Sequence, residues 1–228
     1  DSSKLDKGNR WGNFPSFSAG WTLSNESFIR DNISESILSF AKIRGSWGRN
    51  GNVNILSGYK YTTGIAQNSQ WYQPSASNSL SLGSQPNGVA NPDLTWETSE
   101  QIDLGLDLRF LDHRLAFGFD YYNKKTKDLL VDAPCLPESG VSSMTLNAGE
   151  IENKGFEIEL SWKDKIGDLN YSISANLAHN SNEVTYLAKS IERITGAGIS
   201  GSNYTKLTTQ FEEGHPVWYM WGYKYLGK

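Results

Sequence analysis

The stretch QIDLGLDLRFLDHRLAFGFDYY, residues 101–122, decides the fold class of this chain. Apolar side chains occupy every second position in residues 102–110 and again in residues 115–121, which is the period of one face of a β-strand. With residues 111–114 as the turn, a single hairpin register matches apolar residues across the two arms. The predicted pairs are Phe110 with Leu115, Leu108 with Phe117, Leu106 with Phe119, and Leu104 with Tyr121.

Other segments alternate in the same way. Strands are predicted near residues 16–23, 38–48, 156–162, 170–177 and 217–226, the last without a partner. A turn at residues 165–168 would pair Trp162 with Tyr171 and Leu160 with Ile173. The connections alternate in length: residues 24–37, 111–114 and 164–168 are short, whereas residues 49–95, 123–153 and 181–214 are long, polar and predicted to be loops.

This pattern predicts an all-β fold, an antiparallel up-and-down transmembrane β-barrel segment with short periplasmic turns and long extracellular loops. Strands of about ten residues, tilted by about 40°, span an apolar band of about 25 Å. Interfacial aromatic residues are expected near strand ends, at Trp47, Trp96, Tyr121, Trp162 and Tyr171. The polar side of the strands is predicted to face the lumen through Lys42, Arg44, Asp103, Asp107, Arg109, Asp120, Glu157 and Glu159.

The amino-acid composition excludes some classes of protein and gives no support to others. The 228 residues are 37% apolar and 12% aromatic, so a disordered chain is excluded. The net charge of −4, with both signs interspersed, gives no reason to expect nucleic acid as a partner. A single cysteine, Cys135, excludes an internal disulfide, and no apolar run is long enough for a transmembrane helix. Because the chain opens at Asp1 in a loop, we expect a fragment of a longer protein.

No catalytic residues can be named. Asp103 with Asp107 and Glu157 with Glu159 lie about 13 Å and about 7 Å apart along their strands, spacings that permit a glycosidase but also suit a solvated lumen wall near Arg109 and Lys42. The three histidines are scattered, and no phosphate loop, nucleophile elbow or zinc signature occurs. The sequence therefore predicts a protein that is not an enzyme and has no cofactor or metal.

The aromatic residues of the long loop 49–95 are the candidates for substrate binding. Trp71, Tyr72, Tyr59 and Tyr61 have flat faces that stack on sugar rings or apolar side chains, with Asn and Gln nearby. Packing of one loop on another is an equally good explanation for them. An alternative function is a soluble β-sandwich carbohydrate-binding module, although loops of this length at one end only are unusual for a compact sandwich.

Several strings in a fixed order resemble the C-terminal half of the barrel of SusC/RagA-like TonB-dependent outer-membrane transporters. They are RWGNFPS at residues 10–16, KIRGSWG at 42–48, NPDLTWE at 91–97, DYY at 120–122 and NAGEIENKGFE at 147–157. The resemblance implies a 22-stranded barrel in the outer membrane of a Gram-negative bacterium. It also implies an N-terminal plug, a SusD-like surface lipoprotein as lid, and import of oligosaccharides or peptides with energy from the TonB complex.

On this resemblance, residues 1–228 are an incomplete part of one TonB-dependent receptor β-barrel domain. The plug, the TonB-contacting N-terminal part and the remaining strands are expected to lie outside it. The expected partners are the rest of the same barrel and its plug, the SusD-like lipoprotein, the TonB complex, the lipid bilayer and the oligosaccharide or peptide substrate.

Overall fold

The computed structural model describes residues 1–72, 81–86, 88–141, 143–189, 191–201, 205–224 and 226. Its regular structure is almost entirely β. The elements, in order, are β1 (Ser16–Thr22), the 3₁₀ turn η1 (Leu23–Asn25), α1 (Ser27–Arg30), β2 (Leu38–Asn52), β3 (Ile65–Tyr72), β4 (Ser81–Pro86), β5 (Glu97–Phe110), β6 (Leu115–Pro134), the 3₁₀ turn η2 (Pro137–Ser139), β7 (Ser143–Ile166), β8 (Leu169–Leu187), β9 (Ile194–Gly201), β10 (Thr205–Phe211) and β11 (Tyr219–Trp221).

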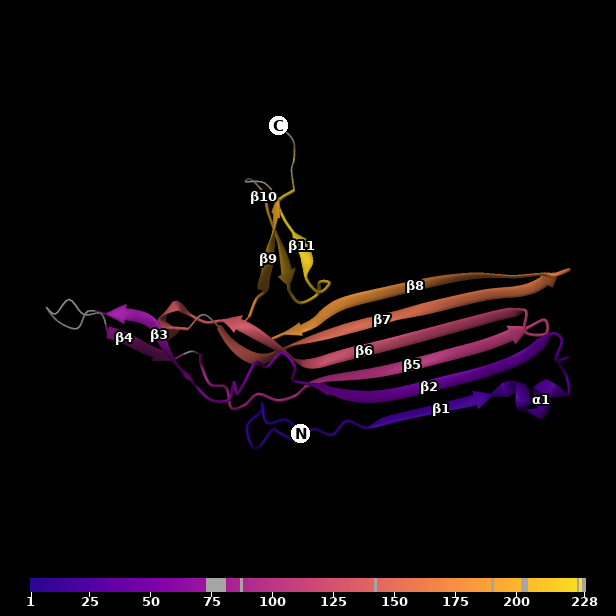
Figure 1. Ribbon diagram of the computed structural model, residues 1–228, viewed down its shortest axis with the longest axis horizontal. Coiled ribbons are helices and arrows are strands. Elements are labelled where there is room, and N and C mark those ends of the chain that lie inside the picture. The colour runs from indigo at the N-terminus through magenta and orange to yellow at the C-terminus, as the bar shows by residue number, and fades with distance from the viewer. Residues whose placement is uncertain are drawn as a thin grey trace.

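The main body is a six-stranded sheet in the order β1-β2-β5-β6-β7-β8, with every neighbouring pair antiparallel. Its short connections, including α1, lie together at one end of the long strands (Figure 1). At the other end the β3–β4 hairpin extends beyond the sheet, and β9, β10 and β11 form a separate three-stranded sheet. The up-and-down order and the short-turn end agree with the sequence prediction.

The register of the central hairpin is confirmed. β5 and β6 pair Phe110 with Leu115, Leu108 with Phe117, Leu106 with Phe119, and Leu104 with Tyr121. Its turn is left-handed, because Leu111, Asp112 and His113 have φ angles of 56°, 57° and 64°. L-residues other than glycine and asparagine rarely adopt this conformation. The turn contains neither of these two residues, so the sequence did not indicate its turn type.

The predicted register of the second hairpin is wrong by two residues. β7 pairs Trp162 with Ile173 and Leu160 with Ala175, and Tyr171 lies opposite Asp164. The turn between Ile166 and Leu169 has two residues, not four, and it begins at Gly167 with a φ of 61°. A glycine with positive φ allows the tight hairpin turns that match strand twist. Because the slip is an even number of residues, the predicted faces are unchanged.

The long connections contain far more strand than predicted. β6 has 20 residues and β7 has 24, so most of residues 123–153 is ladder and not loop. β2 continues to Asn52 and β8 to Leu187, and the other long connections carry the β3–β4 hairpin and strands β9 and β10. The last predicted strand shortens to β11, which pairs with β10 and so is not unpaired.

Two apolar clusters explain why these outer segments fold without an alternating pattern. One cluster is formed by Ala133, Ala148, Val184, Leu187, Ile191 and Phe211, and it joins β6, β7 and β8 to β10. The other is formed by Leu5, Val53, Leu56, Leu94 and Leu130. Adjacent residues of β6 serve different clusters, because Leu130 lies in the second and Leu129 and Val131 pack on the first. A strand that is covered on both faces carries apolar residues on both, so its sequence shows no alternation of apolar and polar residues.

Trp96, which is expected near a lipid interface, packs against this second cluster. It also makes an edge contact with Phe14 at 5.2 Å between ring centroids. Trp96 therefore has protein contacts on one side, and its position at a lipid interface stays a prediction. No helix in the described part of the chain is long and apolar enough to cross a membrane.

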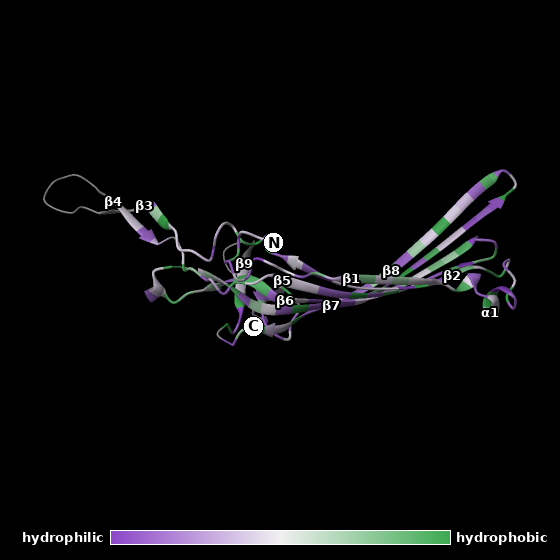
Figure 2. Cartoon of the chain, turned by 90° about the horizontal axis from the view of Figure 1, so that it is seen from below, coloured by the Kyte–Doolittle hydropathy of each residue, from purple (hydrophilic) through white to green (hydrophobic). Residues whose placement is uncertain are grey.

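The main sheet has one apolar and one polar face, and Figure 2 shows hydrophobic and hydrophilic bands alternating along its strands. The register aligns one apolar residue from each of five strands, Ile43, Leu106, Phe119, Ile158 and Leu177. This face is not covered by a second sheet, since Leu104 is 53% exposed and Ile173 is 66% exposed. A β-sandwich buries its apolar face, so the structure does not favour the sandwich alternative.

Candidate functional site: the polar face and the outer cleft

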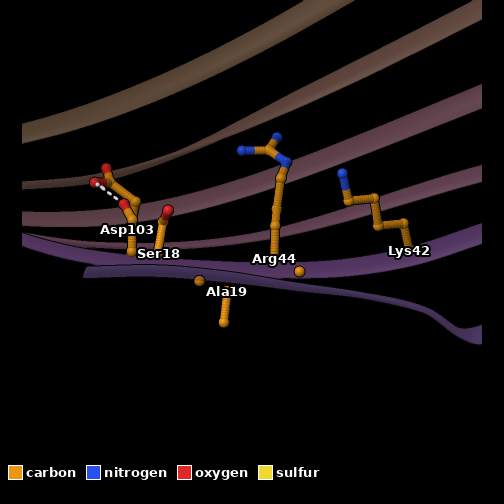
Figure 3. Close-up of a pocket in the computed structure, with 8 residues that line it drawn as sticks. Ser18, Ala19, Lys42, Arg44 and Asp103 are labelled. Carbon is orange, nitrogen blue, oxygen red and sulfur yellow. Dashed lines mark hydrogen bonds between the residues drawn. The ribbon is translucent and has the colours of Figure 1, made fainter.

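The charged residues predicted to face the lumen all lie on the polar face of the main sheet. The register joins Arg44, Gly105, Asp120 and Glu157 in one row across β2, β5, β6 and β7, and joins Lys42, Asp107, Gly118 and Glu159 in the next. Asp103 and Arg109 follow on β5 by the period of two. In Figure 3 the side chains of Ser18, Lys42, Arg44 and Asp103 point to the same side of the sheet, and Ala19 points to the other.

Arg44 is the centre of an ion-pair network on this face. Its Nε donates a hydrogen bond to Asp107 Oδ2 at 3.1 Å, and its Nη2 donates to Asp120 Oδ2 at 2.7 Å. The three side chains are between 35% and 40% exposed in this sheet. One guanidinium therefore links β2 to β5 and to β6, because its Nε and Nη2 donate to carboxylates on different strands.

Gly105 makes this reach possible. A Cβ added to Gly105 would lie 2.5 Å from Arg44 Cζ and 2.7 Å from its Nε. The guanidinium therefore crosses β5 in the space that the missing side chain leaves. The sequence showed Gly105 only as a small residue in the polar half of the pattern, and the acids were expected near Arg109 and Lys42. The hydrogen bonds of Arg44 give it this role, while Arg109 lies over the Phe40 ring, with its Cζ 5.3 Å from the ring centroid.

Asp103 has a second set of contacts beside this network. Ser46 Oγ donates to its Oδ2 at 3.0 Å, and Gln101 Nε2 donates to its Oδ1 at 2.8 Å. With Ser18, Lys42 and Arg44 it lines a pocket of about 290 Å³ (Figure 3). The pocket presents hydroxyl, carboxylate and cationic groups together, so it suits a polar ligand or a polar protein surface and offers no hydrophobic anchor.

A larger cleft lies at the outer end, and it is lined by one of the predicted aromatic residues, Tyr59, whose ring contacts that of Tyr61. Tyr59 and Tyr61 make an edge contact with centroids 5.9 Å apart, and Tyr59 is 59% exposed. A cleft of about 770 Å³ is lined by Tyr59, Lys60, Asp132, Met144 and Thr145, among others. It therefore lies between the 57–66 segment and the ends of β6 and β7. The side chains of Trp71 and Tyr72 lie outside the described part of the structure, although the backbone of both belongs to β3.

Asparagine side chains hold the outer segment 88–96 against β6 and β7, a role that the sequence reading missed. Asn147 Oδ1 accepts from the Thr95 backbone at 2.9 Å, and its Nδ2 donates to Thr95 O at 3.1 Å and Asp128 O at 2.8 Å. Asn91 Nδ2 donates to Thr145 O at 2.9 Å. The strings NPDLTWE and NAGEIENKGFE were the available signal, because each begins with one of these asparagines.

Metal ligation has no candidate among the residues that the structure describes, where no group of three or more His, Cys, Asp or Glu side chains converges. The three histidines also lie apart in the fold: His113 is in the β5–β6 turn, His179 in β8, and His215 stacks on Tyr219 at 4.5 Å. The chemistry available on the polar face is therefore hydrogen bonding and ion pairing.

Comparison with known proteins identifies the relatives of this chain. A family model described as TonB dependent receptor-like, beta-barrel matches residues 1–228. TonB-dependent receptor P3 of Formosa agariphila is 35% identical over 232 residues, covering 99% of this chain and 22% of the relative. TonB-dependent receptor SusC of Bacteroides thetaiotaomicron is 33% identical over 212 residues, covering 90% and 21%. The chain spans about a fifth of the length of these curated relatives.

Solved structures match in shape as well. The structure of the RagAB peptide transporter superposes with a TM-score of 0.76 at 28% identity, covering 94% of this chain and 22% of that one. The RagAB peptide importer in the 'open-open' state superposes with a TM-score of 0.70 at 26% identity, covering 91% of this chain and 24% of that one.

Proposed function

Because the chain belongs to the TonB dependent receptor-like, beta-barrel family, we propose that it forms one sector of a transmembrane barrel in the outer membrane of a Gram-negative bacterium. The two-faced sheet carries this proposal. Its exposed apolar face suits contact with lipid, and its polar face, with Lys42, Arg44, Asp103, Asp107, Arg109, Asp120, Glu157 and Glu159, then lines the lumen. Residues 1–228 are an incomplete part of that barrel domain, and its other strands and plug belong to the remainder of the protein.

The complete protein imports oligosaccharides or peptides, with energy from the TonB complex and with a SusD-like surface lipoprotein as partner. Support comes from two kinds of relative: one is named SusC, and the other is titled a peptide transporter. The matches are receptors and transporters, which agrees with a protein that has no catalytic role. The extended outer strands and the cleft at Tyr59 lie at the end where substrate and lipoprotein would be met.

Uptake by cells tests this function. The complete gene is deleted in its host, and growth is measured on neutral oligosaccharides and on peptides as sole nutrient. Loss of growth on one class, restored by the intact gene but not when TonB is removed, is the expected result. Unchanged growth and uptake on every class, with the protein present in the outer membrane, would contradict import.

Tyr59 in the cleft and Tyr61, whose ring contacts that of Tyr59, are the proposed substrate contacts within this chain, together with Trp71 and Tyr72. A Tyr59→Ala, Tyr61→Ala double variant of the complete protein should insert normally and lose about fivefold or more in substrate affinity, since an aromatic contact contributes about 0.5–1.5 kcal/mol. Tyr186→Ala is the matched control, because Tyr186 is exposed on β8 and is not among the cleft residues. Equal affinity in the double variant and the control would assign Tyr59 and Tyr61 to loop packing.

A further inference from the structure

The apolar face of the sheet, which is the lipid-facing side of the proposed barrel, becomes charged within two rows of residues toward the outer end. The row Gly45, Leu104, Tyr121, Phe156 and His179 is largely apolar or aromatic. The next row toward the outer end is Trp47, Ile102, Asn123, Lys154 and Ser181, and the one beyond is Arg49, Glu100, Lys125, Glu152 and Glu183. From Ile102 to Phe110 the lipid-facing part of β5 has about nine residues, or about 23 Å along the membrane normal at a tilt of about 40°. Lys154 and Lys125 therefore lie at headgroup depth.

These two lysines converge on one carboxylate. Lys125 Nζ lies 3.4 Å from Glu152 Oε1, and Lys154 Nζ lies 3.6 Å from Glu152 Oε2. Asn123 Nδ2 donates to Glu152 Oε1 at 3.0 Å, and this bond together with the lysine charges holds the pKa of the Glu152 carboxyl below its usual range. Glu152 stays ionised, so Lys125, Lys154 and Glu152 together carry one net positive charge; in the same row, Glu100 lies beside Lys125 and Glu183 lies beside Glu152. The Glu152 side chain is 15% exposed, whereas those of Lys125 and Lys154 are 55% and 50% exposed.

An aromatic surface adjoins the lysines on the membrane side. Phe156 follows Lys154 by two residues on the same face of β7, and it stacks on Phe119 at 6.4 Å between centroids. On its other side the Phe156 ring meets His179 at 5.7 Å. Exposed ammonium groups above half-buried phenylalanine rings and the exposed Tyr121 match an anionic lipid, whose acyl chains need an apolar surface and whose phosphate needs a cation.

We propose that Lys125 and Lys154 bind the phosphate group of an anionic lipid in the outer leaflet, with the acyl chains of that lipid lying along Phe119, Tyr121 and Phe156. The proposal rests on the proposed function, because the outer leaflet is placed by the barrel orientation with its short turns on the periplasmic side. Glu152 fixes the spacing of the two ammonium groups without neutralising both.

Lipid titration followed by native mass spectrometry tests the site. The complete transporter in neutral detergent is titrated with phosphatidic acid, with phosphatidylcholine and with inorganic phosphate. Each surface lysine contributes about fivefold in affinity for an anionic lipid, so Lys125→Gln with Lys154→Gln should weaken the tightest phosphatidic acid site about 25-fold. Phosphatidylcholine should bind equally to both proteins, and inorganic phosphate at the same concentration should not displace phosphatidic acid.

Lys124→Gln is the matched control, because Lys124 is next to Lys125 in β6 but pairs with Gln101 and Asn153 on the polar face. Its phosphatidic acid affinity should equal that of the unchanged protein. Equal affinity in the double variant and the unchanged protein, equal loss in Lys124→Gln, or displacement by inorganic phosphate would each overturn the lipid site. TonB-dependent uptake, measured in parallel, separates the two claims: uptake without a lipid effect rejects only the lipid site, and absence of uptake rejects the transporter.

Discussion

At the scale of single residues, the polar face depends on a side chain that is missing. Arg44 reaches across β5 to Asp107 and Asp120 through the space that a side chain at Gly105 would fill. Glycine weakens a strand interior, and its presence there often marks a close approach by another group. Here the group that approaches is a guanidinium from the neighbouring strand.

Gly105→Ala should therefore displace Arg44 and break its hydrogen bonds to both aspartates. We expect a loss of about 1 kcal/mol in the free energy of unfolding of the complete barrel, a small value because the pairs are partly exposed and screened. Gly118→Ala is the control on the adjacent strand, since its added Cβ would meet Glu159 Cβ at an ordinary 3.6 Å. Urea unfolding in detergent measures both, and equal stability of the two variants would contradict the role of Gly105.

Asn147 is the second residue with a specific prediction. Asn147→Ala removes the hydrogen bonds that join β7 to Thr95 and Asp128, so the 88–96 segment should open more often. Limited proteolysis of the complete protein should then cleave near this segment several-fold faster. Asn176→Ala, on the exposed polar face of β8, should leave the cleavage rate unchanged. A rate that is the same in both variants would show that other contacts hold the segment.

At the scale of elements, each long strand has two parts with different rules. Near the short turns the strands separate apolar from polar residues, because one side suits lipid and the other a polar lumen. Further out, the same strands are covered by loops and by the β9–β11 sheet, and the alternation stops. Ile151 and Val184 are paired on the same side of the sheet as the polar face, nearer the outer end of the strands. Val184 lies in the cluster that contains Phe211, and Ile151 packs against it. β10 therefore covers the outer end of that face.

The inner parts of the strands allow a direct test of which face meets lipid. Leu106→Arg, in the middle of the apolar face, should cost about 2–4 kcal/mol in barrel stability. Asn176→Arg lies at nearly the same depth, because it shares a row with Glu159 and Asp107 on the polar face, and it should be almost silent. Refolding yield into detergent or vesicles measures the difference. Equal tolerance of arginine at both positions would refute the assignment of faces.

At the scale of the whole molecule, the main sheet ends at β1 and β8, each of which pairs with one neighbour in the described structure. An open edge presents unpaired backbone groups, and in lipid each such group costs several kcal/mol. The apolar face adds large exposed side chains, with Leu177 at 59% exposure. In the proposed barrel, further strands would pair with β1 and with β8 and so close both edges.

Residues 1–228 produced alone should therefore aggregate in buffer or require detergent. Size-exclusion chromatography and thermal unfolding of the isolated segment, beside the complete protein in the same detergent, provide the measurement. The complete protein should elute as a defined species and unfold cooperatively. A soluble monomer of the segment with a cooperative melt would contradict the barrel assignment and revive the sandwich.

The sequence by itself determined the two-faced strands, their up-and-down order and the register of the central hairpin, because a period of two on both arms admits one matching alignment. It also identified which charged residues share the polar face. Only the tertiary structure decided how far the strands run, since a strand covered on both faces by loops has no period to detect, as Leu129, Leu130 and Val131 show. The two-residue turn at Gly167 and the partners of Arg44 were likewise decided in three dimensions, because a slip of two residues preserves every face and a guanidinium can reach across more than one strand.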